Sequence, residues 1–115
     1  MTITEAITRA NLLRPNAVPD SVKSEWLYSI DAQVAEQMGE DDHKKVWPED
    51  DTELLIPFPH DEFYVWHVMA KIDLINEETS LYAADAAVAN QMMSESCRWY
   101  QRNKKAEPYK PVKVM

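Results

Sequence analysis

The spacing of apolar residues predicts two amphipathic helices in the N-terminal part of the chain. Over 3–13, apolar side chains recur every three or four positions, which is the period of one helix face. Thr2 and Glu5 stand at the start of this pattern with the spacing of a capping box. Over 20–38 the apolar stripe advances in steps of four residues and ends before Gly39, a residue that adopts a left-handed φ without steric cost. The stripe consists of Val22, Trp26, Ile30, Val34 and Met38, and the opposite, polar face of Lys23, Glu25, Asp31 and Glu36.

Two further helices are predicted in the C-terminal half. The stretch 60–76, which begins at His60 or Asp61, is apolar on almost all sides and is therefore expected to lie centrally in the fold. Asn76 to Thr79 form a tight break. The stretch 79–103 is rich in alanine, the strongest helix former, and would span roughly 37 Å as a continuous helix.

The stretch 39–59 differs from the rest of the chain because seven acidic residues crowd around Trp47. Like charges at this density repel one another and favour an open, acidic loop. The apolar run 54–56 within it is compatible with an extended segment lying on the helices or with a brief strand. The seven acidic residues are Glu40, Asp41, Asp42, Glu49, Asp50, Asp51 and Glu53.

These patterns together predict a small all-α bundle of about four helices, with a single helical domain over 1–103 and a basic, flexible tail over 104–115. Charge is divided unevenly between the two parts. Residues 1–97 hold six basic and nineteen acidic residues, a net −13, whereas residues 98–115 hold six basic residues and one acidic residue, a net +5. An acidic body with a basic end suits head-to-tail contact between subunits, and a solvated tail is the plainer alternative.

Composition removes several function classes from consideration. The chain has 115 residues and a formal charge of −8, which disfavours non-specific coating of nucleic acid. Its only cysteine excludes an internal disulfide and a cysteine-based zinc site, and its only glycine leaves no phosphate-binding glycine loop. No apolar run approaches a membrane span and no signal peptide opens the chain, so we expect a soluble, intracellular domain without membrane contact.

Residues with chemical potential are present, but none forms a recognisable catalytic or metal-binding pattern. Glu40 and His43 have the Glu-x-x-His spacing of carboxylate-bridged metal sites, which require two such copies on facing helices. His60 is expected near a helix start, His67 half-buried among apolar neighbours, and Cys97 as a small packing residue. The helical acids also lack the paired i, i+3 spacing with which all-α pyrophosphohydrolases hold magnesium. We therefore predict no enzyme activity, no cofactor and no metal.

The chain offers two groups of candidate interface residues. Trp26 and Trp66 lie on helical stripes and are expected in the core, whereas Trp47 lies in the acidic stretch and is a candidate interface anchor. The predicted loop contacts are Trp47, Leu54, Leu55 and Ile56, and the predicted basic-end contacts are Arg98, Arg102, Lys104 and Lys105.

Several short segments of the chain also occur in a characteristic order. They are Glu5-Ala6-Ile7, Leu13-Arg14-Pro15-Asn16-Ala17, Trp26-Leu27, Thr52-Glu53-Leu54-Leu55-Ile56-Pro57, Pro59-His60-Asp61 with Tyr64, Met69-Ala70-Lys71-Ile72-Asp73, and Trp99-Tyr100. Over residues 1–103 the chain thereby resembles a family of small proteins encoded in the head-morphogenesis region of tailed phages and prophages of Gram-positive bacteria, which is similar to head–tail connector (head-completion) proteins. Family members often read Asn-Gly-Glu between the last two helices, where this chain has Asn76-Glu77-Glu78.

The resemblance implies a structural virion protein that assembles below the portal and extends the DNA channel. It implies a ring of identical subunits on assembly, with portal and tail-proximal phage proteins as partners and no specific binding of nucleic acid; a monomer when free is compatible with it. The implied location is the cytoplasm of the bacterial host during assembly and then the virion. Two other classes stay open: an acidic protein-interaction module of phage or prophage origin, either regulatory or a DNA mimic, and a small helical enzyme.

Overall fold

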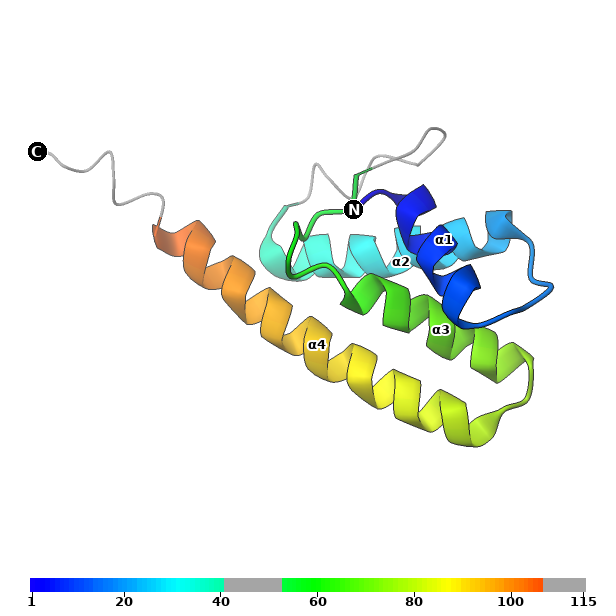
Figure 1. Cartoon of the computed structure of the whole chain (residues 1–115). Coiled ribbons are helices and arrows are strands. Elements are labelled where there is room, and N and C mark those ends of the chain that lie inside the picture. Colours follow the sequence, from blue (N-terminus) through cyan, green and yellow to red (C-terminus); the bar gives the residue numbers. More distant parts are fainter. Residues whose placement is uncertain (41–52, 107–115) are drawn as a thin grey trace, which may run out of the picture.

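The protein is an all-α bundle, as the hydrophobic pattern predicts. The computed structural model describes residues 1–40 and 53–106, and side chains up to Lys104. Four helices fill these ranges: α1 (Ile3–Leu13), α2 (Asp20–Met38), α3 (Phe63–Ile75) and α4 (Thr79–Ala106) (Figure 1). Outside the helices, an isolated β-bridge pairs Thr2 with Glu53.

The ends of the first two helices follow the local signals in the sequence. Thr2 and Glu5 form the predicted capping box, in which each side chain accepts a hydrogen bond from the other residue's backbone N–H. Gly39 ends α2 in the left-handed region with φ 77°, and its N–H bonds to carbonyls of the last turn. These two predictions are confirmed at the residues that carry them.

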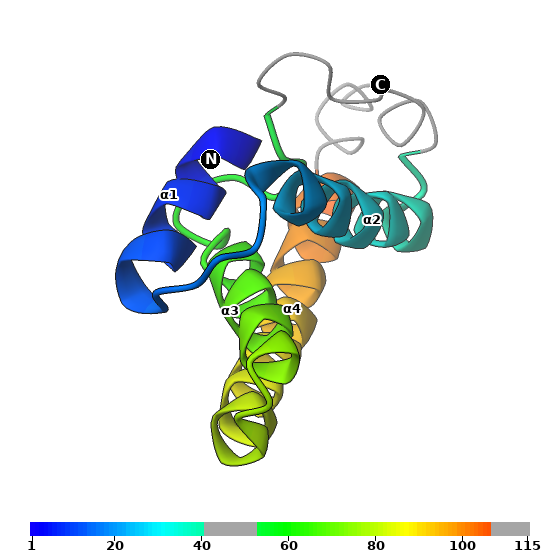
Figure 2. The same cartoon turned by 90° about the vertical axis from the view of Figure 1, so that its right-hand side faces the viewer.

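Helix α3 occupies the centre of the fold, because it packs against each of the other three helices. It runs antiparallel to α4, and the turn between the two lies away from α1 and α2 (Figure 2). Phe63, Tyr64, Val68 and Ile72 are almost completely buried on it. The all-round apolar character of this stretch thus predicts its central position correctly.

The segment 53–62 lies against the helices as an irregular chain with bends and turns, and its residues Leu54 and Ile56 belong to the core. Leu54 and Ile56 are 3% and 0% exposed. The carboxylate of Asp31 holds the segment, since its Oδ1 accepts hydrogen bonds from the Leu55 N–H at 3.1 Å and from the Tyr64 hydroxyl at 2.6 Å. The Tyr64 oxygen in turn accepts one from the Ile56 N–H at 3.2 Å. The apolar run thus lies on the helices, as one of the two alternatives predicts, but as a bent segment, and the brief strand is not formed over 54–56.

Two boundaries therefore differ from the prediction. Helix α3 begins at Phe63 instead of at His60 or Asp61, because the preceding residues form turns: the His60 N–H donates to the Pro57 carbonyl at 2.9 Å, and the His60 carbonyl accepts a 2.7 Å hydrogen bond from the Ser96 hydroxyl. Helix α4 continues to Ala106, three residues beyond its predicted end, and includes the residues assigned to the start of the tail.

The predicted polar face of α2 is also partly wrong. Lys23 and Asp31 are 2% and 5% exposed, although the four-residue stripe places them opposite the apolar side chains. Each has polar partners that make its burial tolerable. The Lys23 ammonium donates to Asn11 at 2.6 Å and to Asp20 at 3.3 Å. Among the described residues, no helix has both the length and the hydropathy required to cross a membrane.

Candidate functional site

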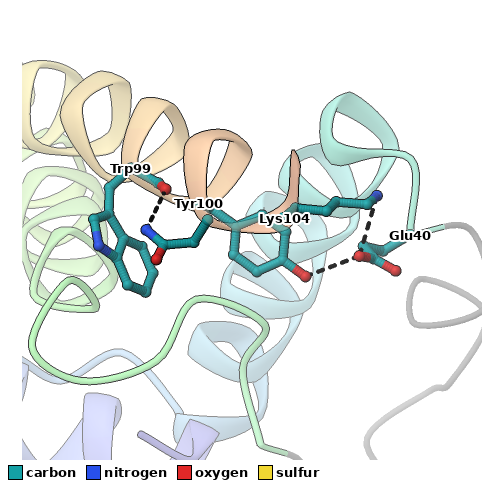
Figure 3. Close-up of a pocket in the computed structure, with 5 residues that line it drawn as sticks. Glu40, Trp99, Tyr100 and Lys104 are labelled. Atoms are coloured by element: carbon teal, nitrogen blue, oxygen red, sulfur yellow. Dashed lines mark hydrogen bonds and ion pairs between the residues drawn. The ribbon is translucent and has the colours of Figure 1, made fainter. Parts of the chain in front are cut away.

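A pocket of about 260 Å³ lies where the C-terminal ends of α2 and α4 meet (Figure 3). Lys104 and Tyr100 reach from α4 toward Glu40, which follows Gly39 at the end of α2. The pocket is lined by Glu40, Trp99, Tyr100, Asn103 and Lys104.

The polar groups of this pocket bind one another. The Lys104 ammonium donates to the backbone carbonyl of Met38 and lies 3.2 Å from the Glu40 carboxylate. The Tyr100 hydroxyl donates to the same carboxylate at 2.9 Å. A cation at the carbonyl end of a helix interacts favourably with the helix dipole, so Lys104 caps α2 and joins it to α4.

The wall of the pocket is aromatic and unreactive. The ring of Trp99 stacks on the ring of His60 with a centroid separation of 4.0 Å and an interplanar angle of 26°. The Asn103 side chain donates to the carbonyl of Trp99 at 2.9 Å. The arrangement stabilises the end of α4 and leaves an amphipathic hollow beside it.

The four predicted basic-end residues divide into two groups. Arg98 and Arg102 are exposed and one helical turn apart on α4, where they are available to a partner. Lys104 is 42% exposed at its side chain and already engaged within the chain. Lys105 lies in the last turn of α4, and its side chain falls outside the described part.

The predicted loop contacts are placed mainly inside the molecule. Leu54 and Ile56 are buried in this chain's own core, and Leu55 is half-buried against it. This corrects the interpretation of Leu54 and Ile56 as contacts to a neighbouring subunit, whereas for Leu55 that role stays a prediction. The apolar run is attracted to the nearest available hydrophobic surface, which is its own helical bundle. Trp47 lies outside the described residues. Trp26 and Trp66, predicted to be core residues, are partly buried and pack against the core.

Large apolar side chains stay exposed at the turn between α3 and α4. We call this surface the hairpin end and define it by Leu74, Ile75, Glu77, Glu78 and Leu81. Leu74 and Ile75 are 50% and 52% exposed, and Leu81 is 38% exposed. An apolar groove of about 390 Å³ adjoins it and is lined by Ala17, Val18, Pro19, Val22, Ile75 and Asn76. Contiguous exposed apolar surface is typical of interaction sites.

A buried ionic cluster joins three helices near the hairpin end. The Arg14 guanidinium, at the C-cap of α1, lies 3.1 Å from Asp73 of α3 and 2.8 Å from Asp85 of α4. Burial, together with the neighbouring Asp85 carboxylate, raises the pKa of Asp73 to about 6, although Arg14 opposes the shift. One oxygen of Asp73 is buried without a hydrogen-bond partner. Two carboxylates thus share one guanidinium, and the pair is poised to hold a proton.

Sequence reasoning missed these buried polar groups, although one signal was present. Asp73 interrupts the apolar pattern of α3 on the buried side, where an unpaired carboxylate would not be tolerated. An isolated acid in an apolar helix therefore indicates a cationic partner elsewhere in the chain. Nothing in the local pattern identifies Arg14 as that partner, because 59 residues separate the two.

The candidate catalytic and metal-binding residues remain dispersed. His67 is half-buried, and burial, with a smaller contribution from Lys71, lowers its pKa to about 4. Cys97 is partly buried against the core, and burial raises the pKa of its thiol, which disfavours the reactive thiolate. In residues 1–40 and 53–106, no three His, Cys, Asp or Glu side chains are grouped to hold a metal ion. His43 lies outside these ranges.

Comparison with protein-family models gives no match, and neither the curated proteins nor the solved structures contain a match to this chain.

Proposed function

We propose that this protein is a structural component of a phage particle, a head–tail connector that assembles below the portal and extends the DNA channel toward the tail. On this proposal it acts through protein contacts, as a ring of identical subunits next to portal and tail-proximal proteins. It carries out no catalysis and requires no cofactor. It is made in the bacterial cytoplasm and ends in the virion.

The structural observation that carries the proposal is the contrast between buried and exposed groups. Charged groups in the interior are paired within the fold, as for Arg14 with Asp73 and Asp85, whereas apolar side chains at the hairpin end are left in solvent. A protein that works by docking needs such surface, and a small enzyme instead needs a pocket with converging reactive groups. The resemblance of the ordered segments over 1–103 supplies the phage context.

The net charge is compatible with a DNA conduit. A chain with a formal charge of −8 repels the phosphates of passing DNA, so DNA can move through a channel lined by it without being held. Tight binding of duplex DNA to the purified protein at moderate salt would contradict this aspect of the proposal.

The alternative function is an acidic interaction module, for example a DNA mimic. A mimic must present its carboxylates on the surface at a phosphate-like spacing. Of the fourteen acidic residues in the described ranges, four are buried, which removes them from any such display. These four are Asp31, Asp61, Asp73 and Asp85. We therefore rank this function second.

The proposal is tested by deleting the gene from its source phage or prophage, inducing particle production and examining the lysate by electron microscopy. We expect heads without tails, often empty of DNA, and restoration of complete particles when the gene is supplied on a plasmid. The matched control is the same plasmid with an early stop codon, which separates loss of the protein from an effect on neighbouring genes. Complete, infectious particles from the deletion strain would refute the connector function and favour the acidic interaction module.

A further inference from the structure

The two ends of the α3–α4 hairpin differ in charge. The hairpin end carries two consecutive exposed carboxylates, Glu77 and Glu78, between the exposed apolar residues Ile75 and Leu81. The C-terminal end of α4 carries two exposed guanidinium groups, Arg98 and Arg102. Figure 1 places these two regions at opposite ends of the molecule.

Each of the two ends adjoins a hollow, the apolar groove at the hairpin end and the pocket at the C-terminal end of α4. That pocket is lined by Trp99 and Tyr100 and not by the two arginines, which lie on another side of α4. We call Arg98 and Arg102 the basic end. Exposed guanidinium groups suit a surface that carries carboxylates, and the hairpin end has that composition.

We propose that the hairpin end of one chain docks on the basic end of a second copy, head to tail. Two carboxylates then face two guanidinium groups, and the apolar side chains of Leu74, Ile75 and Leu81 leave solvent at the joint. The two surfaces are different parts of the same chain, so a docked pair leaves one surface of each kind unoccupied. Such a heterologous contact closes into a ring or continues as a filament, depending on the rotation between neighbours.

This inference rests on the proposed function in one respect, that the chain assembles with copies of itself. It adds which surfaces meet. An isologous dimer would instead bring the same surface of both copies together, and the two arrangements respond differently to charge reversal.

The test uses two charge-reversed forms of the full chain. One form carries Glu77→Lys with Glu78→Lys, so that both of its ends are basic. The other carries Arg98→Glu with Arg102→Glu, so that both of its ends are acidic. Neither form can make the proposed joint with itself. In a 1:1 mixture, however, the hairpin end of the first form, now basic, can pair with positions 98 and 102 of the second form, where Arg98→Glu and Arg102→Glu have made the surface acidic. The other two surfaces, the basic end of the first form and the hairpin end of the second, keep their native charge.

Self-association is measured by sedimentation velocity over a concentration series at low salt. We expect the unmodified chain to associate, each reversed form to have a dissociation constant raised by roughly thirtyfold, and the 1:1 mixture to recover the association of the unmodified chain. Added salt should weaken association of the unmodified chain, because exposed charges are screened. The matched control is Glu25→Lys with Glu36→Lys on the exposed face of α2, which should associate as the unmodified chain does.

Circular dichroism checks that each variant keeps its helical content. If the unmodified chain stays monomeric at every concentration, or the reversed forms associate normally, or the mixture fails to recover association, the head-to-tail joint is wrong. These outcomes leave the connector function to be judged separately: tailless heads in the deletion strain together with a failed mixture would retain the function and reject these two surfaces.

Discussion

The turn between α3 and α4 contains a residue in a conformation that glycine prefers. Glu77 has φ 59°, in the left-handed region, and it is the only residue other than glycine with a positive φ in the described ranges. Its N–H donates to the carbonyl of Leu74 and the next N–H donates to the carbonyl of Asp73, which ends α3 as a glycine C-cap would. We predict that Glu77→Gly stabilises the protein.

The expected gain is the difference between two opposing effects. The left-handed conformation costs a residue with a Cβ atom about 1–2 kcal/mol, and glycine avoids this cost. Glycine also gives the unfolded chain more freedom, which takes back about 0.5–1 kcal/mol. The net gain in the free energy of unfolding is therefore about 0.5–1 kcal/mol, which corresponds to a rise in Tm of roughly 2–6 °C for a domain of this size.

Urea denaturation followed by circular dichroism gives the free energy of unfolding, and a thermal scan gives Tm. The matched control is Glu78→Gly, which removes the same charge at the adjacent position, where φ is not positive. We expect no gain from it. A Glu77→Gly variant that is no more stable than the unmodified chain, or a gain of equal size from Glu78→Gly, would refute the argument from backbone conformation.

Three further predictions concern the buried polar groups and the cap of α2. Asp73 has a folded-state pKa of about 6, above its ordinary value of 3.8, so its stabilising contribution is fully present below about pH 4 and is lost as the pH rises through 6. As the pH rises from 4 to 7, the free energy of unfolding of Asp73→Asn should therefore increase relative to that of the unmodified chain by about 2–3 kcal/mol, as measured by urea titration. A difference between the two proteins that stays constant with pH would contradict the raised pKa of Asp73. Asp31→Ala removes the acceptor shared by the Leu55 N–H and the Tyr64 hydroxyl and should lower the free energy of unfolding by about 2–4 kcal/mol. Tyr64→Phe should lower it by only about 1–2 kcal/mol. Equal losses from the two variants would show that the Asp31 carboxylate does not organise the segment 53–62. Lys104→Ala should lower the free energy of unfolding by only about 0.5 kcal/mol, because the ammonium is partly exposed. It should also speed amide hydrogen exchange at the end of α2, and unchanged exchange there would contradict the capping role of Lys104.

The helices of this protein are predictable because their signals are local. The capping box at Thr2 and Glu5, the left-handed Gly39 and the all-round apolar α3 each require information from one stretch of chain only. The start of α3 is less predictable, since it depends on a turn at His60 and on the hydrogen bond of His60 with Ser96, a residue 36 positions away.

Burial of polar residues could not be read from the same local patterns. A helical period assigns Asp31 to the solvent face because it is charged, yet its burial follows from partners on a segment and a helix that approach only in the folded state. The candidate interface shows the same limit. Arg98 and Arg102 are exposed, as basic residues at the end of the chain are expected to be. The hydrophobicity of Leu54 and Ile56 indicates that they contact an apolar surface, but it does not indicate whether that surface belongs to the same chain or to a neighbouring subunit.

The continuity of α4 has a consequence for dimensions. Its 28 residues form one helix without an interruption, so its two ends are held about 42 Å apart by hydrogen-bonded backbone. A flexible linker of the same residues would leave that separation variable. Where one end of a copy contacts the opposite end of the next, the length of this helix sets the separation between equivalent contact points of neighbouring copies, and a change of residue count within it would also rotate one end against the other by about 100° per residue.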